Sequence, residues 1–132
     1  MICLEIAQYL HDNNHGVYDT VGTTGTIFIH GIPMEPVELI SLYQRVSEDS
    51  DTRNEYLVPH VQAIVRDRNF VNVMTRGQEI IKSLNGFTNG PLIAGGKHVI
   101  SVLALQSSPI SLGKDDGGNW EVSLNFRVEY KE

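Results

Sequence analysis

The chain has 132 residues, of which 41% are hydrophobic and 20% are charged, so we expect residues 1–132 to form one domain with its own core. Its formal net charge of −6, with no basic cluster, disfavours a nucleic-acid-binding module. The single cysteine, Cys3, excludes an internal disulfide, and no apolar run approaches the roughly 20 residues of a membrane-spanning helix.

The first part of the chain predicts one helix and one short strand. Apolar residues at helical spacing predict an amphipathic helix from the N-terminus to Asn13, with Cys3 as a buried thiol among them. A turn rich in glycine and threonine follows, and residues 26–30 are β-prone. Pro33 and Pro36 then prevent a regular strand from continuing.

Two strands are predicted in the middle of the chain. Residues 37–46 are β-branched and aromatic, and residues 57–67 alternate between apolar and polar side chains. We expect these strands to pair with each other across the segment 47–55. That segment is polar, acidic and without a hydrophobic anchor, so it is predicted to be a solvated loop.

The hydrophobic period changes to that of a helix after Asn69, which is the predicted N-cap. Asn85 and Gly86 are expected to end this helix. Gly77 lies on its apolar side, where we expect the missing side chain to allow close packing against a sheet. Residues 98–106 then predict another apolar strand.

The C-terminal segment alternates strictly and predicts one long strand with an apolar and a polar face. The apolar face is formed by Trp120, Val122, Leu124, Phe126, Val128 and Tyr130. The segments 87–97 and 107–118 are expected to be connections. Because strands do not alternate with helices, the predicted fold class is α+β, with an antiparallel or mixed sheet and two helices packed on one face. The polar face of the sheet is left for solvent or for another copy of the chain.

Two motifs resemble ligand sites without meeting their requirements. Gly90, Gly95 and Lys97 partly match a phosphate-binding loop, but an additional glycine precedes the lysine and the segment leads into a strand instead of a helix. His11 and His15 have the spacing of metal ligands on a helix, but no third ligand is recognisable. We therefore expect neither a nucleotide site nor a metal site.

The segment DDGG at 115–118 is predicted to be a tight turn that uses aspartate and glycine, because the ligand spacing of a calcium loop is missing. No serine or threonine lies in a nucleophile-elbow motif, and no pair of carboxylates is recognisable as an acid–base couple. The sequence therefore predicts no catalytic residue, no cofactor and no enzymatic activity.

The order of these segments resembles the tail terminator proteins of long-tailed bacteriophages, which are also described as minor capsid or tail-to-head joining proteins. The likeness extends over nearly the whole chain. It is carried by Pro33, Pro36, Tyr43, Tyr56, Pro59, Val61, Gln62, Val65, Arg66, Pro109, Gly113, Asp115, Trp120, Leu124, Asn125 and Phe126.

The resemblance implies a tail-terminator-like subunit that assembles into a ring, expected to be a hexamer. Such a ring ends the growing tail tube, joins it to the head connector and lets genomic DNA pass through its lumen without specific binding. The implied partners are further copies of the chain, the tail tube protein and the connector or neck protein, with no membrane. The implied location is the tail or neck of the virion, and the host cytoplasm during assembly.

Two groups of charged residues are predicted to make contacts between subunits. The first is the acidic loop, with Glu48, Asp49, Asp51, Arg53 and Glu55. The second is the pair Arg66 and Arg68 at the end of a strand, which could meet carboxylates of an adjacent subunit. Two alternatives stay open: the loop is solvated without a partner, or the arginines form only intramolecular surface pairs, worth less than about 1 kcal/mol.

Two other functions are also compatible with the sequence. One is a different head–tail connector or neck completion protein. The other is a non-phage α+β domain that binds a ligand between its sheet and a helix. That function would need polar residues facing inward, whereas the alternation of the C-terminal strand places apolar residues there.

Overall fold

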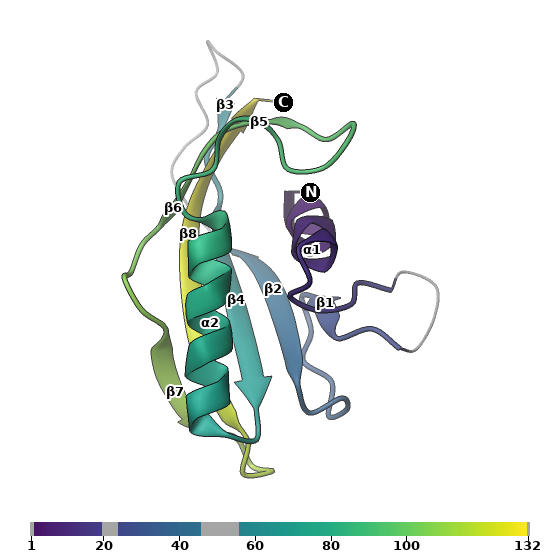
Figure 1. The fold of residues 1–132 in the computed structure, drawn as a ribbon, viewed down its shortest axis with the longest axis vertical. Coiled ribbons are helices and arrows are strands. Elements are labelled where there is room, and N and C mark those ends of the chain that lie inside the picture. Colours follow the sequence, from purple (N-terminus) through teal and green to yellow (C-terminus); the bar gives the residue numbers. More distant parts are fainter. Residues whose placement is uncertain (1, 20–23, 46–55, 132) are drawn as a thin grey trace.

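The computed structural model describes residues 2–19, 24–45 and 56–131, and it confirms the predicted α+β architecture (Figure 1). Both predicted helices and all of the strands predicted from sequence are present. In chain order the elements are α1 (Ile2–Asp12), β1 (Ile27–Ile29), β2 (Leu39–Arg45), β3 (Tyr56–Leu57), β4 (His60–Asp67), α2 (Phe70–Leu84), β5 (Thr88–Pro91), β6 (His98–Ala104), β7 (Ile110–Lys114) and β8 (Trp120–Lys131).

The eight strands form one mixed sheet with the order β1-β2-β4-β8-β6-β5. Only β1 and β2 are parallel among these pairs. The expected pairing of the two middle strands is confirmed, since β2 and β4 are antiparallel from Leu39 opposite Arg66 to Arg45 opposite His60. β8 has 12 residues and is the central strand: β4 and β3 pair with one of its edges, and β7 and β6 pair with the other.

Two segments that were expected to be connections contain strands. β5 lies in the segment 87–97 and pairs with β6, and β7 lies in the segment 107–118 and pairs with β8. TNGP has no apolar alternation, ISLGK alternates only over Ile110 to Leu112, and most side chains of both strands are exposed. Both strands owe their conformation to hydrogen bonds with a longer neighbour, which a pattern of side chains cannot predict.

Both helices lie on the same face of the sheet (Figure 1). α1 packs against β1 and β2, whereas α2 packs across β4, β8 and β6. The Tyr9 hydroxyl of α1 donates to the carbonyl oxygen of Ser83 in α2 at 2.9 Å, which joins the two helices. In the part of the chain that is described, neither helix is long and apolar enough to cross a membrane.

The core between helices and sheet is one continuous apolar cluster. The predicted apolar face of β8 supplies its centre, since Leu124 and Phe126 are at most 1% exposed, while Trp120 is half-buried and packs edge-to-face on Phe70 at 5.0 Å. The expected burial of Cys3 is confirmed. Burial raises the pKa of its thiol to about 11, so the thiol is not a nucleophile at neutral pH.

The ends of α2 match the expected caps. Asn69 accepts a hydrogen bond from the backbone N–H of Asn72 at 3.1 Å through its side chain, and the N–H of Asn85 donates to the carbonyl oxygen of Ile81. Gly86 follows with a φ of +86°, a conformation that favours glycine.

At Gly77 the helix α2 packs closely against β8 and against the segment that precedes β7. A Cβ atom there would lie 2.7 Å from Cγ of Pro109 and 3.3 Å from Cδ2 of Leu124 in β8. We therefore expect Gly77→Ala to lower the free energy of unfolding by about 1–3 kcal/mol through overpacking, although alanine is the better helix former by about 1 kcal/mol. Chemical denaturation measures this change.

The exposed position Thr75 on the same helix provides the control. Thr75→Ala should change the free energy of unfolding by no more than about 0.5 kcal/mol. A Gly77→Ala variant as stable as the wild type would show that the contact with Pro109 relaxes freely.

Candidate functional site

The face of the sheet that carries no helix is crossed by a ladder of hydrogen-bonded polar side chains. Arg45 of β2 donates from Nε to Oε1 of Gln62 at 2.9 Å, and Gln62 donates from Nε2 to Oγ of Ser123 at 2.9 Å. Asn125 donates from Nδ2 to Ser123 Oγ at 3.2 Å and to Gln106 Oε1 at 2.9 Å. These groups satisfy one another, so this face is polar, ordered and compatible with solvent in the lone subunit.

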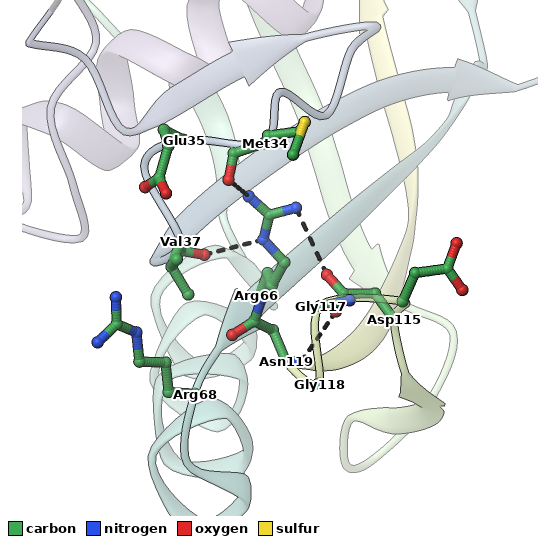
Figure 2. A pocket seen from close by; sticks show the side chains of 10 residues that line it. Met34, Glu35, Val37, Arg66, Arg68, Asp115, Gly117, Gly118 and Asn119 are labelled. Atoms are coloured by element: carbon green, nitrogen blue, oxygen red, sulfur yellow. Dashed lines mark hydrogen bonds and ion pairs between the residues drawn. The ribbon is translucent and has the colours of Figure 1, made fainter.

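A buried arginine at the end of β4 lies on the same face of the sheet. Arg66 is 5% exposed, and its Nε donates to the carbonyl oxygen of Val37 at 2.9 Å (Figure 2). Its Nη2 lies 2.7–3.0 Å from three further carbonyl oxygens, those of Pro33, Met34 and Pro36. One guanidinium group therefore fixes the backbone of the segment 33–37, which we call the 33–37 loop.

The other side of the guanidinium group faces the turn between β7 and β8. Oδ2 of Asp115 lies 3.7 Å from Nη1 of Arg66, and Oδ1 accepts backbone N–H groups of Asn119 at 2.8 Å and Gly117 at 2.9 Å. The hydrogen bond from Asn119 is the largest of the effects that lower the pKa of Asp115, and the charge of Arg66 adds to them. The expected tight turn at 115–118 is confirmed, and Gly118 has a φ of +79°.

A second carboxyl group lies across from Arg66 on β8. Glu121 is opposite Arg66 in the β4–β8 register, and burial raises its pKa above the ordinary value. The negative charge of Asp115 raises this pKa further, whereas Arg66 lowers it. Asp115 is the carboxylate whose oxygen lies within ion-pair distance of the buried guanidinium.

An open recess of about 780 Å³ lies between the 33–37 loop and the 115–119 turn (Figure 2). Its lining combines apolar side chains, among them Met34 and Val37, with charged groups of both signs, including Glu35, Arg68 and Asp116. Among the described residues, no group of three histidine, cysteine, aspartate or glutamate side chains could hold a metal ion.

The two arginines that were predicted to act together have different environments. Arg66 is buried and its donors are used within the subunit, whereas Arg68 is exposed at the edge of the recess. Arg66 forms its contacts within its own subunit, as in the alternative of purely intramolecular pairs, but these contacts are buried instead of lying on the surface. The predicted interface residues of the acidic loop lie outside the described residues: Glu48, Asp49, Asp51, Arg53 and Glu55.

One flank of the sheet exposes large apolar side chains that the sequence did not single out. Leu103, Leu105, Ile110 and Leu112 are each 48–52% exposed, and they lie along β6, β7 and the segment that joins them. β7 pairs only with β8 within the described part of the chain, so its second edge is open. Clustered apolar residues beside an open strand edge are typical of a protein–protein contact.

Because Arg66 makes several hydrogen bonds, we expect its substitution to lower the free energy of unfolding more than substitution of any other residue near the surface of the sheet. We expect Arg66→Met to lower the free energy of unfolding by about 2–5 kcal/mol, because several carbonyl groups and Asp115 lose a charged donor together. Arg68→Met is the matched control, with an expected change within about 0.5 kcal/mol. Urea denaturation followed by circular dichroism measures both, and equal effects of the two changes would contradict the assignment.

Comparisons with known proteins agree with this architecture. A family model described as "Bacteriophage tail terminator protein" matches residues 9–132. A comparison with the curated proteins gives no match. A solved chain from the "Virion of native gene transfer agent (GTA) particle" has the same fold, with a TM-score of 0.70 and 15% identity over 99% of this chain and 95% of that chain. The chain therefore belongs to the bacteriophage tail terminator family and is a structural component of the virion tail.

Proposed function

We propose that copies of this chain form a ring, expected to be a hexamer, that ends the tail tube and joins it to the head connector. The observation that carries the proposal is the tail terminator match over residues 9–132. In this proposal residues 1–132 act as one domain with a purely structural role, and neither catalysis nor a cofactor is involved. The partners are further copies of the chain, the tail tube protein and a neck protein.

The surface of the lone subunit supports assembly into a closed ring. The open edge of β7 and the exposed leucines beside it leave apolar surface that another chain can cover. A ring is built from head-to-tail contacts, in which one flank of each subunit meets the opposite flank of the next. A subunit with dissimilar flanks, one formed by β6 and β7 and the other by the 33–37 loop, suits such contacts.

The charge of the chain supports passage of DNA through the ring. Each subunit carries a formal charge of −6, and a ring multiplies that charge by the number of its subunits. Binding to the phosphate backbone draws its sequence-independent affinity from basic side chains that release counterions. We therefore propose that DNA slides through the lumen without specific binding.

The ring is tested by native mass spectrometry and negative-stain electron microscopy of the full chain, alone and mixed with the tail tube protein. We expect closed rings, either free or at one end of each tube, and we expect tubes to stop growing when the chain is added. Single molecules under both conditions, with unchanged tube growth, would refute the proposal.

We also propose that the acidic loop contacts a partner in the assembled tail. Deleting residues 49–53 should leave the free energy of unfolding unchanged within about 0.5 kcal/mol, because the sequence of the loop has no hydrophobic anchor. The deletion should impair joining of tails to heads, measured as infectious particles formed in a complementation assay.

A variant with the same five positions replaced by glycine and serine separates loop length from loop charge. If the charges make the contact, this variant should be as defective as the deletion. Normal joining by both variants would eliminate the role of the loop and leave the ring proposal standing.

A further inference from the structure

The sheet face that carries no helix ends in two different surfaces, one on each flank. β2 lies on one side of β8 and β6 lies on the other (Figure 1). Arg45 of β2 is opposite His60 of β4, and His60 is opposite Arg127 of β8. Arg127 is in turn opposite Leu103 of β6. Residues that are opposite one another project from the same face, so Arg45 and Leu103 are the two ends of one row across the uncovered face.

Contact between copies at the level of this row depends on side chains, not on strand pairing. β2 and β6 are the last strands of the row, because β1 and β5 pair with other parts of them. The N–H of Gln44 on β2 donates to Nε2 of His30 at 3.1 Å. The N–H of Ala104 on β6 donates to Oδ1 of Asn85 at 2.8 Å. These two donors are therefore not available to a strand of another chain.

Three side chains at the β2 end of the face form a compact group, which we call the Tyr43 cluster: His30, Tyr43 and Arg45. The His30 ring lies edge-to-face on the Tyr43 ring, with 5.4 Å between their centroids, and the guanidinium carbon of Arg45 lies 4.8 Å from the Tyr43 centroid. Hydrogen bonds to Gln62 hold the guanidinium group in this position. Tyrosine and arginine are enriched among the residues that dominate binding between proteins, and a side chain that is already fixed loses less entropy on binding.

The other end of the face carries an apolar surface, which we call the β6–β7 patch. It consists of Leu103, Leu105, Ile110 and Leu112, each 48–52% exposed. Ile110 is opposite Ser123 of β8, so it projects from the uncovered face, as Leu103 does. Large apolar side chains that are exposed together mark a contact with another protein.

The chemistry and the position of the Tyr43 cluster fit the β6–β7 patch of a second copy. A guanidinium group stacked on an aromatic ring is weakly hydrated, so its flat face can lie on aliphatic side chains. Within one subunit the polar ladder through Gln62, Ser123 and Asn125 separates the two surfaces. When two sheets lie side by side with their uncovered faces on the same side, rows of equal level meet. Arg45 of one copy then lies beside Leu103 of the next.

We propose that the Tyr43 cluster of one subunit packs on the β6–β7 patch of the next, with Arg45 in contact with Leu103. The contact is head-to-tail, because the two surfaces differ, and repetition of it closes a ring. This inference rests on the proposed ring and specifies which surfaces form it.

One charge change on each side of the contact tests it, with oligomer size measured by native mass spectrometry in the presence of the tube protein. Leu103→Lys places a second cation against Arg45, and Arg45→Asp removes the stacked guanidinium group and places a carboxylate against leucine. Each change should weaken association of subunits about 10- to 100-fold. Val71→Lys and Arg68→Asp are the matched controls, because both residues are exposed and lie outside the two surfaces. Circular dichroism and unfolding midpoints verify that every variant is folded.

Combining the two changes in one chain gives a sharper result. Every contact in a ring of Arg45→Asp, Leu103→Lys subunits brings a carboxylate to an ammonium group, so association should recover at least tenfold over either single variant. The two single variants mixed in equal amounts should also assemble, because unaltered contacts then alternate with charge-paired contacts. Contact between two β6–β7 patches would give no recovery in the double variant, since lysine would meet lysine, and that result would overturn the inference.

The remaining outcomes separate this inference from the proposed function. Normal rings from both single variants would overturn the inference and leave the ring itself intact. Normal rings that no longer bind tubes when Leu103 is changed would also overturn it, by assigning the β6–β7 patch to the tube protein. A wild-type chain that never assembles would overturn both the inference and the proposed function.

Discussion

A guanidinium group that is removed from water must find acceptors for its five N–H groups, and this requirement organises one end of the structure. Arg66 meets it with backbone carbonyls of the 33–37 loop and with the carboxylate of Asp115. The 33–37 loop needs hydrogen-bond donors, as Arg66 needs acceptors. Its two prolines have no N–H to place in a ladder, and its carbonyl groups still require donors. Two segments far apart in the sequence are thereby attached to the end of β4.

The position of β8 imposes the second constraint. A strand with partners along both edges cannot change its register, so its two faces are fixed for its whole length. One face must supply the core under α2, and the other must satisfy its polar groups without a covering helix. The ladder from Arg45 to Gln106 does this across neighbouring strands. The subunit is consequently folded and hydrated on this face before any partner arrives.

The elements that could be predicted are those whose own sequence shows a hydrophobic pattern. The alternation of β8 and the helical period of α2, with its Asn69 cap, were sufficient because burial of their apolar faces determines the conformation. β5 and β7 could not be predicted, since their conformation comes from neighbouring strands.

The site was harder to predict than the fold. Arg66 and Arg68 are separated by one residue and were assigned a shared surface, but alternation along a strand does not reveal what covers each face. The cover of Arg66 is a loop about 30 residues earlier in the chain, whose prolines indicated only the end of a strand. The polar ladder was missed for the same reason. Polar residues on β8 were recognised, but their partners depend on a register that sequence alone does not supply.

The distribution of polar and apolar surface bears on how a terminator ring would assemble at the right place. If the whole uncovered face were apolar, subunits would associate at any concentration and independently of the tube. Here the polar side chains of that face bond to one another, and a group of exposed apolar side chains, Leu103, Leu105, Ile110 and Leu112, lies beside β6 and β7. Each contact between subunits would then be modest. In the proposed ring, a tube end that holds several subunits side by side raises their effective concentration and makes successive contacts additive. Modest contacts on a polar, pre-organised subunit thus favour a ring that closes on the tube over one that closes in solution.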